Sequence, residues 1–425
     1  ALCREVGATG GSGYNNTFIG NHAGIAGAAL GWMGSVGIKI DTYFFYNNTA
    51  GHGGGAIYVS PTSHNCTIIN SVFDGNRALN DTDGHGGAID CHASNATVIN
   101  STFSNNKAVT GGAIDVDSDS GNTNIYNSIF SYNAATSEGG ALSVEGSSVT
   151  LNKTDFFYNK ASNGGALFVG GEGITNYVYY SNFVGNNASG GNGGAIDWVA
   201  SAGHIIYSNF TENYANYGGG VYLNGNSHNS NIDHAIFTSN RATVNGGAID
   251  WNATGGNLTN TIFKYNYAGE YGAALCREAN STGGFGYNNT FIGNDAGFGG
   301  AALGWLEAKG IKIDHYTFIN NTAGRSGGAI YVGKGSDDCQ ILNSTFEGNT
   351  VLTGRGGDID WIGTNGYVYN ATFTGSLSRN GGSMYVGEDS NNLTILNAEF
   401  ISCRSLSNGG ALELHGDDVS ITNNR

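Results

Sequence analysis

The chain has 425 residues, a net charge of −16 and only 12% charged residues, with 72 glycines and a single proline. This acidic balance excludes nucleic acid as a partner, because phosphate backbones are bound by basic patches. No apolar run is long enough to predict a transmembrane segment, and a content of 39% hydrophobic residues is too high for a disordered chain.

A Phe-x-x-Asn motif begins near the start of the chain and recurs to its end, at intervals of about 27 residues. Its fifteen copies start at Phe18, Phe45, Phe73, Phe103, Phe130, Phe156, Phe183, Phe210, Phe237, Phe263, Phe291, Phe318, Phe346, Phe373 and Phe400. Asn is present in thirteen copies, and Ser376 and Cys403 replace it in the last two. We expect each Phe ring to stack on the next, with the Asn amides hydrogen-bonded in a ladder.

A second motif, Gly-Gly-Ala-Ile, follows the Phe residues by roughly eight to thirteen positions. Clear copies begin at Gly54, Gly86, Gly111, Gly193, Gly246 and Gly327. The Gly pair fits a tight corner that needs a positive φ or the absence of a Cβ. Between the motifs, apolar residues alternate as they do in strands, and helical periodicity is absent from stretches such as 96–103 and 111–116.

Short strands at a fixed period predict an all-β fold, a parallel β-helix or solenoid. We expect about 15 coils of about 27 residues, with three short strands in each coil. The motifs run through the whole chain, so residues 1–425 are expected to form a single continuous β-helix.

The start of the chain is repeated later in the sequence. Residues 1–21 (ALCREVGATGGSGYNNTFIGN) match residues 274–294 (ALCREANSTGGFGYNNTFIGN) at an offset of 273 residues. This offset equals ten coils, and it slips to 270 by Phe103 and Phe373. The pattern therefore predicts an internal ten-coil duplication, with 1–103 matching 274–373. Both ends of the chain fall within a coil, so we expect either end-to-end self-association, as in a filament, or continuation in a longer chain.

The pairing of Phe-x-x-Asn with Gly-Gly-Ala-Ile resembles the repeat of chlamydial polymorphic outer membrane proteins. The Asn- and Thr-rich coils are also similar to those of adhesin-like surface proteins of methanogenic archaea. The resemblance covers essentially the whole chain. It implies a right-handed parallel β-helix that is extracellular, on the cell surface, and acts in adhesion or as a structural element. No catalytic residues and no cofactor come with this family.

The residue after each Gly-Gly-Ala-Ile motif is expected to point outward, because Ile and the residue two positions later point inward. The candidate ligand-binding residues in this row are Tyr58, Asp90, Asp115, Asp197, Tyr222, Asp250, Tyr331 and Asp360. Such a stripe of aromatic rings and carboxylates suits glycans or proteins as ligands. The alternative interpretation is a solvated sheet face on which Tyr and Phe cover their neighbours.

The stretch DVDSDSGN contains the only pattern in the chain that resembles a metal site. Asp115, Asp117 and Asp119 alternate as ligands do at the start of a calcium loop. However, Gly121 comes one residue late, and Tyr126 stands where the loop needs Glu. The pattern leaves a calcium site and an ordinary acidic turn as alternatives.

Two further side-chain patterns carry predictions. Arg4 and Arg277 occupy the register of Trp32 and Trp305 one coil earlier. This register predicts Arg–Trp stacks between adjacent coils, a contact that is worth about 0.5–1 kcal/mol where it is exposed. Asn-x-Ser/Thr sequons are numerous, and surface glycosylation would fit an extracellular glycoprotein. The candidate glycosylation sites are Asn47, Asn187, Asn252 and Asn280.

These observations predict a non-enzymatic extracellular surface solenoid, either adhesin-like or structural, as in a stalk or filament. Glycans or proteins of host or other cell surfaces are the expected partners, beside further copies of the chain. The alternative is a carbohydrate-active β-helix enzyme, a polysaccharide lyase or hydrolase, that uses the Asp row near His92. Such catalysis needs carboxylates clustered with a basic residue or a metal, and the 17 Lys and Arg residues are widely scattered.

Overall fold

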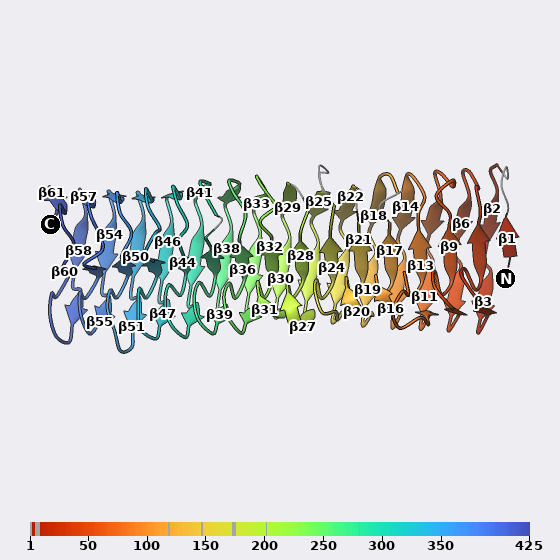
Figure 1. The fold of residues 1–425 in the computed structure, drawn as a ribbon, viewed down its shortest axis with the longest axis horizontal. Coiled ribbons are helices and arrows are strands. Elements are labelled where there is room, and N and C mark those ends of the chain that lie inside the picture. The colour runs from red at the N-terminus through yellow and green to blue at the C-terminus, as the bar shows by residue number, and fades with distance from the viewer. Residues whose placement is uncertain are drawn as a thin grey trace. The chain divides into compact units, whose positions relative to one another are not determined.

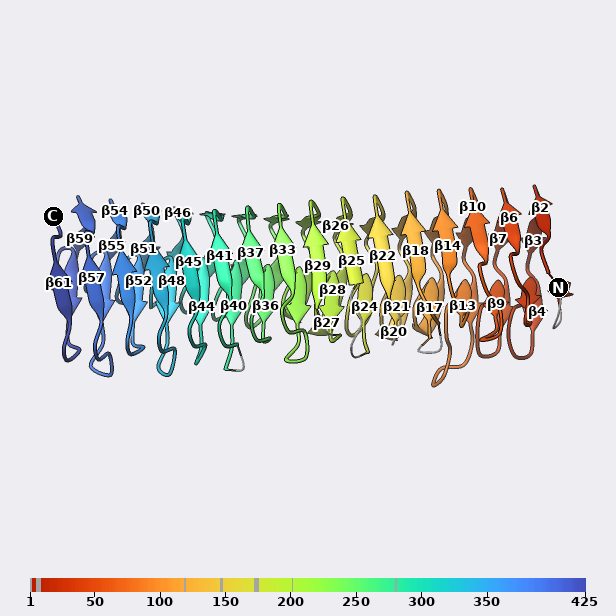
Figure 2. The same ribbon diagram turned by 90° about the horizontal axis from the view of Figure 1, so that it is seen from above.

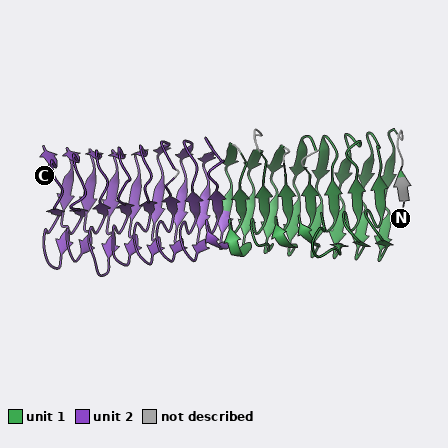
Figure 3. Cartoon of the chain, viewed as in Figure 1, with its two compact units in different colours: residues 1–209 green, residues 210–425 purple. Residues whose placement is uncertain are grey.

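The computed structural model describes residues 2–4, 9–117, 120–145, 148–171, 176–200, 202–279 and 281–425. These residues form strands and turns and contain no helix, so none of them forms an apolar helix long enough to cross a membrane. They divide into two compact units, Ala1–Asn209 and Phe210–Arg425 (Figure 3). In each unit the chain winds through successive coils of parallel strands, about fifteen in the described residues together (Figure 1, Figure 2). The predicted parallel β-solenoid is therefore confirmed.

In unit 1 (Ala1–Asn209), equivalent strands of successive coils pair into parallel ladders. The first ladder contains β1 (Leu2–Arg4), β5 (Leu30–Trp32), β9 (Ile57–Val59), β13 (Ile89–Cys91), β17 (Ile114–Val116), β21 (Leu142–Val144), β24 (Leu167–Val169) and β28 (Ile196–Trp198). The second contains β2 (Ser12–Tyr14), β6 (Lys39–Asp41), β10 (Thr67–Ile69), β14 (Ala96–Ile99), β18 (Thr123–Tyr126), β22 (Val149–Asn152), β25 (Asn176–Tyr179) and β29 (Gly203–Ile206). The third contains β3 (Thr17–Ile19), β7 (Phe44–Tyr46), β11 (Val72–Asp74), β15 (Thr102–Ser104), β19 (Ile129–Ser131), β23 (Asp155–Phe157) and β26 (Asn182–Val184). The fourth position holds β4 (His22–Ala23), β8 (Thr49–Ala50), β12 (Arg77–Ala78), β16 (Lys107–Thr110), β20 (Ala134–Glu138) and β27 (Asn187–Asn192).

Unit 2 (Phe210–Arg425) repeats this arrangement, and β30 (Asn209–Thr211) runs across the sequence boundary between the units. Its first ladder contains β32 (Val221–Leu223), β36 (Ile249–Trp251), β40 (Leu275–Arg277), β44 (Leu303–Trp305), β48 (Ile330–Val332), β52 (Ile359–Trp361), β56 (Met384–Val386) and β60 (Leu412–Leu414). The second contains β33 (Asn231–Asp233), β37 (Asn257–Thr259), β41 (Phe285–Tyr287), β45 (Lys312–Asp314), β49 (Gln340–Leu342), β53 (Tyr367–Tyr369), β57 (Thr394–Leu396) and β61 (Ser420–Thr422). The third contains β34 (Ile236–Thr238), β38 (Ile262–Lys264), β42 (Thr290–Ile292), β46 (Thr317–Ile319), β50 (Thr345–Glu347), β54 (Thr372–Thr374) and β58 (Glu399–Ile401). The fourth contains β31 (Tyr214–Tyr217), β35 (Arg241–Ala242), β39 (Tyr267–Ala268), β43 (Asp295–Ala296), β47 (Thr322–Ala323), β51 (Thr350–Val351), β55 (Leu377–Ser378) and β59 (Arg404–Ser405).

The motif Phe residues form a stacked column in the core. Phe73 pairs in register with Phe103 and Phe103 with Phe130. Their ring centroids lie 4.6 Å and 4.7 Å apart, with the ring planes within 5° of parallel. All three side chains are fully buried. Each coil thus gains aromatic contact area only from its immediate neighbours.

The motif Asn residues form the predicted amide ladder beside the Phe column. Oδ1 of Asn133 accepts hydrogen bonds from the backbone N–H and from Nδ2 of Asn106, at 3.0 Å and 2.9 Å. Nδ2 of Asn133 in turn donates to Oδ1 of Asn159 and to the carbonyl of Phe103, both at 3.0 Å. The ladder therefore satisfies side-chain and backbone groups that are buried together.

The Gly pair makes the predicted corner. Gly54 has a φ of +57°, and a Cβ on it would lie 2.0 Å from the carbonyl oxygen of Ile57. A Cβ on Gly55 would lie 2.5 Å from the backbone nitrogen of Arg77, on strand β12. The second position of the pair therefore requires Gly, because the backbone of the fourth strand lies against it. This fourth strand was absent from the predicted three-strand coil, because a segment as short as β12 shows no apolar alternation.

Candidate functional site

The residue after each Gly-Gly-Ala-Ile motif forms a row along the first ladder of each unit. The registered pairs are Tyr58 with Asp90, Asp90 with Asp115 and Phe168 with Asp197 in unit 1, and Tyr222 with Asp250 and Tyr331 with Asp360 in unit 2. The structure thus brings the predicted candidates onto one face of the ladder within each unit.

The prediction that this row points into solvent is wrong for its carboxylates. The exposed fractions are 4% for Asp90, 5% for Asp115, 3% for Asp197 and 0% for both Asp250 and Asp360. The turn that leads into a Gly pair lies over the row residue of the next coil. A Cβ on Gly53, for example, would lie 1.9 Å from Oδ2 of Asp90. Tyr58, Tyr222 and Tyr331 are half-buried.

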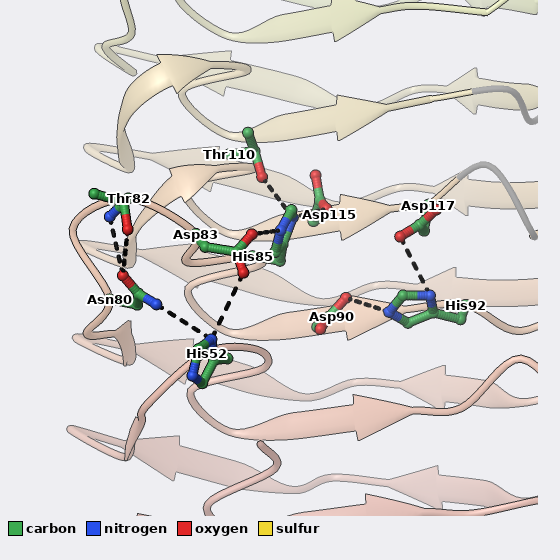
Figure 4. A network of polar contacts seen from close by, with 10 residues as sticks. All are labelled: His52, Asn80, Thr82, Asp83, His85, Asp90, His92, Thr110, Asp115 and Asp117. Carbon is green, nitrogen blue, oxygen red and sulfur yellow. Dashed lines mark hydrogen bonds and ion pairs between the residues drawn. The ribbon is translucent and has the colours of Figure 1, made fainter. Parts of the chain in front are cut away.

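A histidine in unit 1 lies between a buried carboxylate of this row and an exposed carboxylate of the turn before it (Figure 4). Nδ1 of His85 is 3.0 Å from Oδ2 of Asp115, and Nε2 of His85 is 2.9 Å from Oδ1 of Asp83. The hydrogen bond to Asp115 is the main reason that the pKa of His85 rises to about 10, although burial opposes the rise. His85 is therefore an imidazolium at neutral pH, and it lowers the pKa of Asp83.

A second histidine in the same two coils repeats this arrangement (Figure 4). Nε2 of His92 is 3.1 Å from Oδ1 of Asp90, and Nδ1 is 3.3 Å from Oδ2 of Asp117. Its ring also contacts Tyr58, with 5.5 Å between centroids. The bond to Asp90 raises the pKa of His92. Burial raises the pKa of Asp90, against the opposing effect of His92.

A groove opens beside this cluster in unit 1. It has a volume of about 620 Å³ and is lined by Ala23, Ile25, Ala26, Gly27, Gly31, Met33, His52, Gly53, Tyr58 and Asp90. The floor is open because Gly31 has no side chain at the row position. His52, at the rim, contacts Nδ2 of Asn80 at 3.2 Å. The lining is mostly apolar, with the carboxylate of Asp90 as its charged group.

The corresponding place in unit 2 is filled by a tyrosine. Gly304 follows Gly31 at the 273-residue offset of the duplication, and Tyr331 follows Tyr58. There the ring of Tyr271 lies 5.1 Å from the ring of Tyr331 and 4.9 Å from that of Phe298, the counterpart of Ile25. This geometry shows that the walls of the groove fit an aromatic ring.

The carboxylates of unit 2 differ in how they are compensated. Oδ2 of Asp360 accepts a hydrogen bond of 2.9 Å from Nε of Arg355. Burial nevertheless raises the pKa of Asp360 to about 6. Neither carboxylate oxygen of Asp250 has a hydrogen-bond partner among the described residues, and burial raises its pKa well above the usual range. Burial likewise raises the pKa of Asp197, in unit 1, to about 7. Burial thus shifts each of these carboxyls toward its neutral form, which disfavours a charged role toward a ligand.

The predicted calcium ligands do not converge in the described part of the chain. Asp115 and Asp117 contact His85 and His92, respectively, and Asp119 lies outside the described residues. Within the described ranges, no group of three or more His, Cys, Asp or Glu side chains is arranged to hold a metal ion. The calcium site stays a prediction.

The sequon asparagines lie in different environments. Asn47 is exposed at a turn with a φ of +54°. Asn187 is half-buried in β27, and its Oδ1 accepts a hydrogen bond from the backbone of Ser189. Asn252 is half-buried, and Asn280 lies outside the described residues. The turn at Asn47 therefore offers the most accessible amide of the three described sites.

The predicted register of Arg277 with Trp305 is confirmed, but Arg277 stacks on a different Trp ring. Arg277 is buried, with 3% of its surface exposed, because its position in β40 points inward. Its guanidinium lies 4.5 Å from the ring centre of Trp251 in the preceding coil, whereas the prediction paired it with Trp305. Nη1 of Arg277 donates to Ser281 and to the carbonyl of Gly283, which satisfies part of the buried cation.

Sequence analysis missed the residues that cover the row and one coupled set in the core. The signal for the first was the repeated G-H-G-G at 51–54 and 84–87, which places His52 and His85 beside the row. The second set occurs where Ser376 interrupts the Asn ladder. There Nδ2 of Asn349 donates instead to Oδ1 of Asp358, which replaces the Ala of the motif, at 2.9 Å. The joint departure of these two positions from their motifs was the available signal.

The repeat of this chain matches a known family model. The Chlamydia polymorphic membrane protein repeat matches residues 43–60, 100–117, 234–250 and 316–333. The match to residues 43–60 covers β7, β8 and β9, from the Phe-x-x-Asn motif through the Gly-Gly-Ala-Ile strand. No curated protein matches the chain.

Several solved structures are similar to this chain at low sequence identity. A PL6 alginate lyase in complex with a trisaccharide is 10% identical, with 96% of this chain and 90% of that chain covered and a TM-score of 0.42. A tailspike protein of E. coli bacteriophage HK620 in complex with a hexasaccharide is 16% identical, with 96% and 73% covered and a TM-score of 0.42. The mannuronan C-5 epimerase A-module of Azotobacter vinelandii is 11% identical, with 97% and 91% covered and a TM-score of 0.29.

Proposed function

We propose that this chain, which carries repeats of the Chlamydia polymorphic membrane protein type, is an extracellular, adhesin-like surface solenoid without catalytic activity. The observation that carries the proposal is the family match, because each matched segment runs from the Phe-x-x-Asn strand through the fourth strand to the Gly-Gly-Ala-Ile strand. The matched family is one of membrane proteins, and repeated coils present many similar side chains to a partner.

The chemistry of the covered row supports a structural role. A general base must be unprotonated near the working pH. His85 is instead held as a cation, with a pKa of about 10, and the hydrogen bond to Asp90 raises the pKa of His92. Asp90 and Asp115 are buried and engaged with these histidines. Such a cluster neutralises its own charge and links neighbouring coils.

The proposal includes partners of two kinds: glycans or proteins on other surfaces, and further coils of this repeat. The filled counterpart of the groove supports coil-to-coil contact, since Tyr271 fits between walls that recur around Gly31. Further coils come either from another copy of the chain or from a longer chain. Electron microscopy of the native material together with its intact mass distinguishes fibres of this unit from one heavier chain.

Surface display is tested on intact cells that produce the protein. Antibodies against the purified chain are expected to label unpermeabilised cells, and external protease is expected to remove the label. Intact mass of the released protein reports glycosylation, with Asn47 as the first site to examine. Labelling that requires permeabilised cells would refute the proposal.

A second candidate function is a carbohydrate-active enzyme. The specific observation in its favour is that Tyr58 and Asp90 line the groove and adjoin His92. An enzyme that uses these groups would lose polysaccharide cleavage completely in the variants Asp90→Asn and Asp115→Asn. Absence of cleavage by the unmodified chain in a polysaccharide panel would leave the first function in place.

A further inference from the structure

Strands β25 and β29 lie side by side in the second ladder of unit 1 (Figure 2). An aromatic cluster lies on the outward positions of these strands and on the turns that follow them. We name it the aromatic face, and it consists of Tyr177, Tyr179, Tyr180, His204 and Tyr207. Burial alternates along both strands, so Tyr177, Tyr179 and His204 are the half-buried, outward residues. Tyr180 and Tyr207 are 51% and 45% exposed.

The rings of the aromatic face are parallel and close together. The centroids of Tyr177 and His204 lie 4.9 Å apart with 12° between the planes. Those of Tyr177 and Tyr179 lie 5.5 Å apart at 13°, and those of Tyr180 and Tyr207 lie 5.2 Å apart at 1°. Ring–ring contact fixes the side chains before any ligand arrives, which reduces the entropy lost on binding.

The coil does not need aromatic residues at these positions. The equivalent outward residues of β22 are Thr150 and Asn152, and the same strand register is kept. The turn position of Tyr180 and Tyr207 is occupied by Asn in many other coils, including Asn100. Tyr180 and Tyr207 have φ values of +49° and +51°, a conformation that Asn tolerates and that is unfavourable for bulky side chains. The turn thus carries strain that an Asn would reduce.

The aromatic face is uncharged. The described outward residues of β18, β22, β25 and β29 are Asn124, Tyr126, Thr150, Asn152, Tyr177, Tyr179, His204 and Ile206, and none is formally charged at neutral pH. Burial lowers the pKa of His204, which keeps the imidazole neutral. The turn residue of the preceding coil is Lys153, whose N–H donates to the carbonyl of Tyr179. One cation does not make the basic groove that nucleic acids require.

We propose that the aromatic face binds a neutral polysaccharide. Sugar rings have apolar C–H faces that pack on aromatic rings, and their hydroxyls hydrogen-bond to phenol, imidazole and amide groups. A polysaccharide repeats these features along its length, as the parallel rings do along the coils. This inference specifies a ligand class for the proposed surface adhesin. It rests on that function only for the place of binding, which is the cell surface.

The inference is tested with the purified chain by electrophoresis through gels that contain hydroxyethyl cellulose, galactomannan or alginate. We expect retardation in at least one neutral gel and none in the anionic alginate gel. The variant Tyr180→Asn/Tyr207→Asn restores the usual turn residue, so it is expected to fold at least as well and to bind about tenfold more weakly. The variant Tyr177→Ala/His204→Ala is expected to weaken binding by a similar factor. Circular dichroism checks the fold of both.

A matched control is offered by Tyr132 and Tyr158 at a different turn of the same unit. They are 58% and 49% exposed, and their rings are stacked 5.4 Å apart. Tyr132→Ala/Tyr158→Ala is expected to bind as the unmodified chain does. No retardation in either neutral gel, or equal loss in the control, would overturn the inference. The inference would also be overturned if light scattering detected a dimer of the unmodified chain that is absent in Tyr180→Asn/Tyr207→Asn, because the aromatic face would then join two copies. Binding by the purified chain stands even where surface labelling of cells fails.

Discussion

Removal of one amide from the Asn ladder gives the sharpest test of how the coils are held together. In Asn133→Ala, the backbone N–H of Asn106 and one hydrogen of its Nδ2 lose their acceptor, Oδ1 of Asn133. The other amide hydrogen of Asn106 keeps its bond to the carbonyl of Phe73. Asn106 and Asn133 are at most 1% exposed, so water does not replace the lost acceptor.

The carbonyl of Phe103 and Oδ1 of Asn159 also lose the hydrogen bonds that Nδ2 of Asn133 donates. The expected effect is set mainly by the two unpaired donors of Asn106. Each buried unsatisfied group costs about 1–3 kcal/mol, so Asn133→Ala should lower the free energy of unfolding by roughly 2–6 kcal/mol. The measurement is guanidinium denaturation followed by tryptophan fluorescence. The matched control is Asn100→Gly, which removes only an exposed bond to Asn70 at a left-handed turn that Gly tolerates. The control should change the free energy by less than about 1 kcal/mol. Equal shifts of the two denaturation midpoints would refute the ladder as a stabilising element.

Three further perturbations test other parts of the structure. Asp358 is fully buried and its pKa is raised to about 7, so between about pH 4 and 7 it binds a proton that the unfolded chain lacks. The free energy of unfolding should therefore fall as the pH rises through this window. Asp358→Asn should flatten this pH dependence in denaturation experiments at pH 5 to 7.5, and an unchanged slope would contradict the prediction. Gly111→Ala would place a Cβ 2.2 Å from the carbonyl oxygen of Ile114 at a φ of +56°, and it should lower the free energy of unfolding by at least about 2 kcal/mol. Gly190→Ala, whose Cβ would have no atom within 4 Å, should be nearly neutral in the same measurement. Similar denaturation midpoints for the two variants would contradict the steric requirement for Gly at the corner. Cys276 is fully buried, and burial raises the pKa of its thiol. Iodoacetamide at pH 8 should therefore label the half-buried Cys403 before Cys276, as measured by peptide mass spectrometry. The reverse order of labelling would be inconsistent with the structure.

The core was predictable because its chemistry repeats once per coil. Phe103 and Phe130 occupy the same register, so their stacking follows from their spacing alone. The amides of Asn106 and Asn133 follow for the same reason. The left-handed corner at the Gly pair was predictable because the pair recurs, whereas Tyr180 and Tyr207 adopt a left-handed conformation without such a signal. Periodicity identifies which residues occupy equivalent positions in successive coils, and equivalent positions in a solenoid have nearly the same environment.

Burial of the candidate row was not predictable from the same pattern. Whether Asp90 is exposed depends on the turn at Gly53, which comes from the preceding coil and varies in length and composition. The inward direction of Arg277 also contradicts the usual preference for an exposed cation, and it is permitted by Trp251 and local hydrogen bonds. Compensation between Asn349 and Asp358 arises between two turns of one coil, which precede β51 and β52. Such contacts depend on the path between repeats, which spacing does not encode.

The amide ladder also determines how either unit would respond to force. The bonds between Asn106 and Asn133 join one coil to the next, in parallel with the strand pairing around them. A force that peels away the outermost coil acts together on all of the bonds that join this coil to the next one. The coils behind it bear little of the load. Each rupture then releases about 27 residues, or roughly 90 Å of extended chain. Under tension, each unit would lengthen in nearly equal steps and shed one coil at a time.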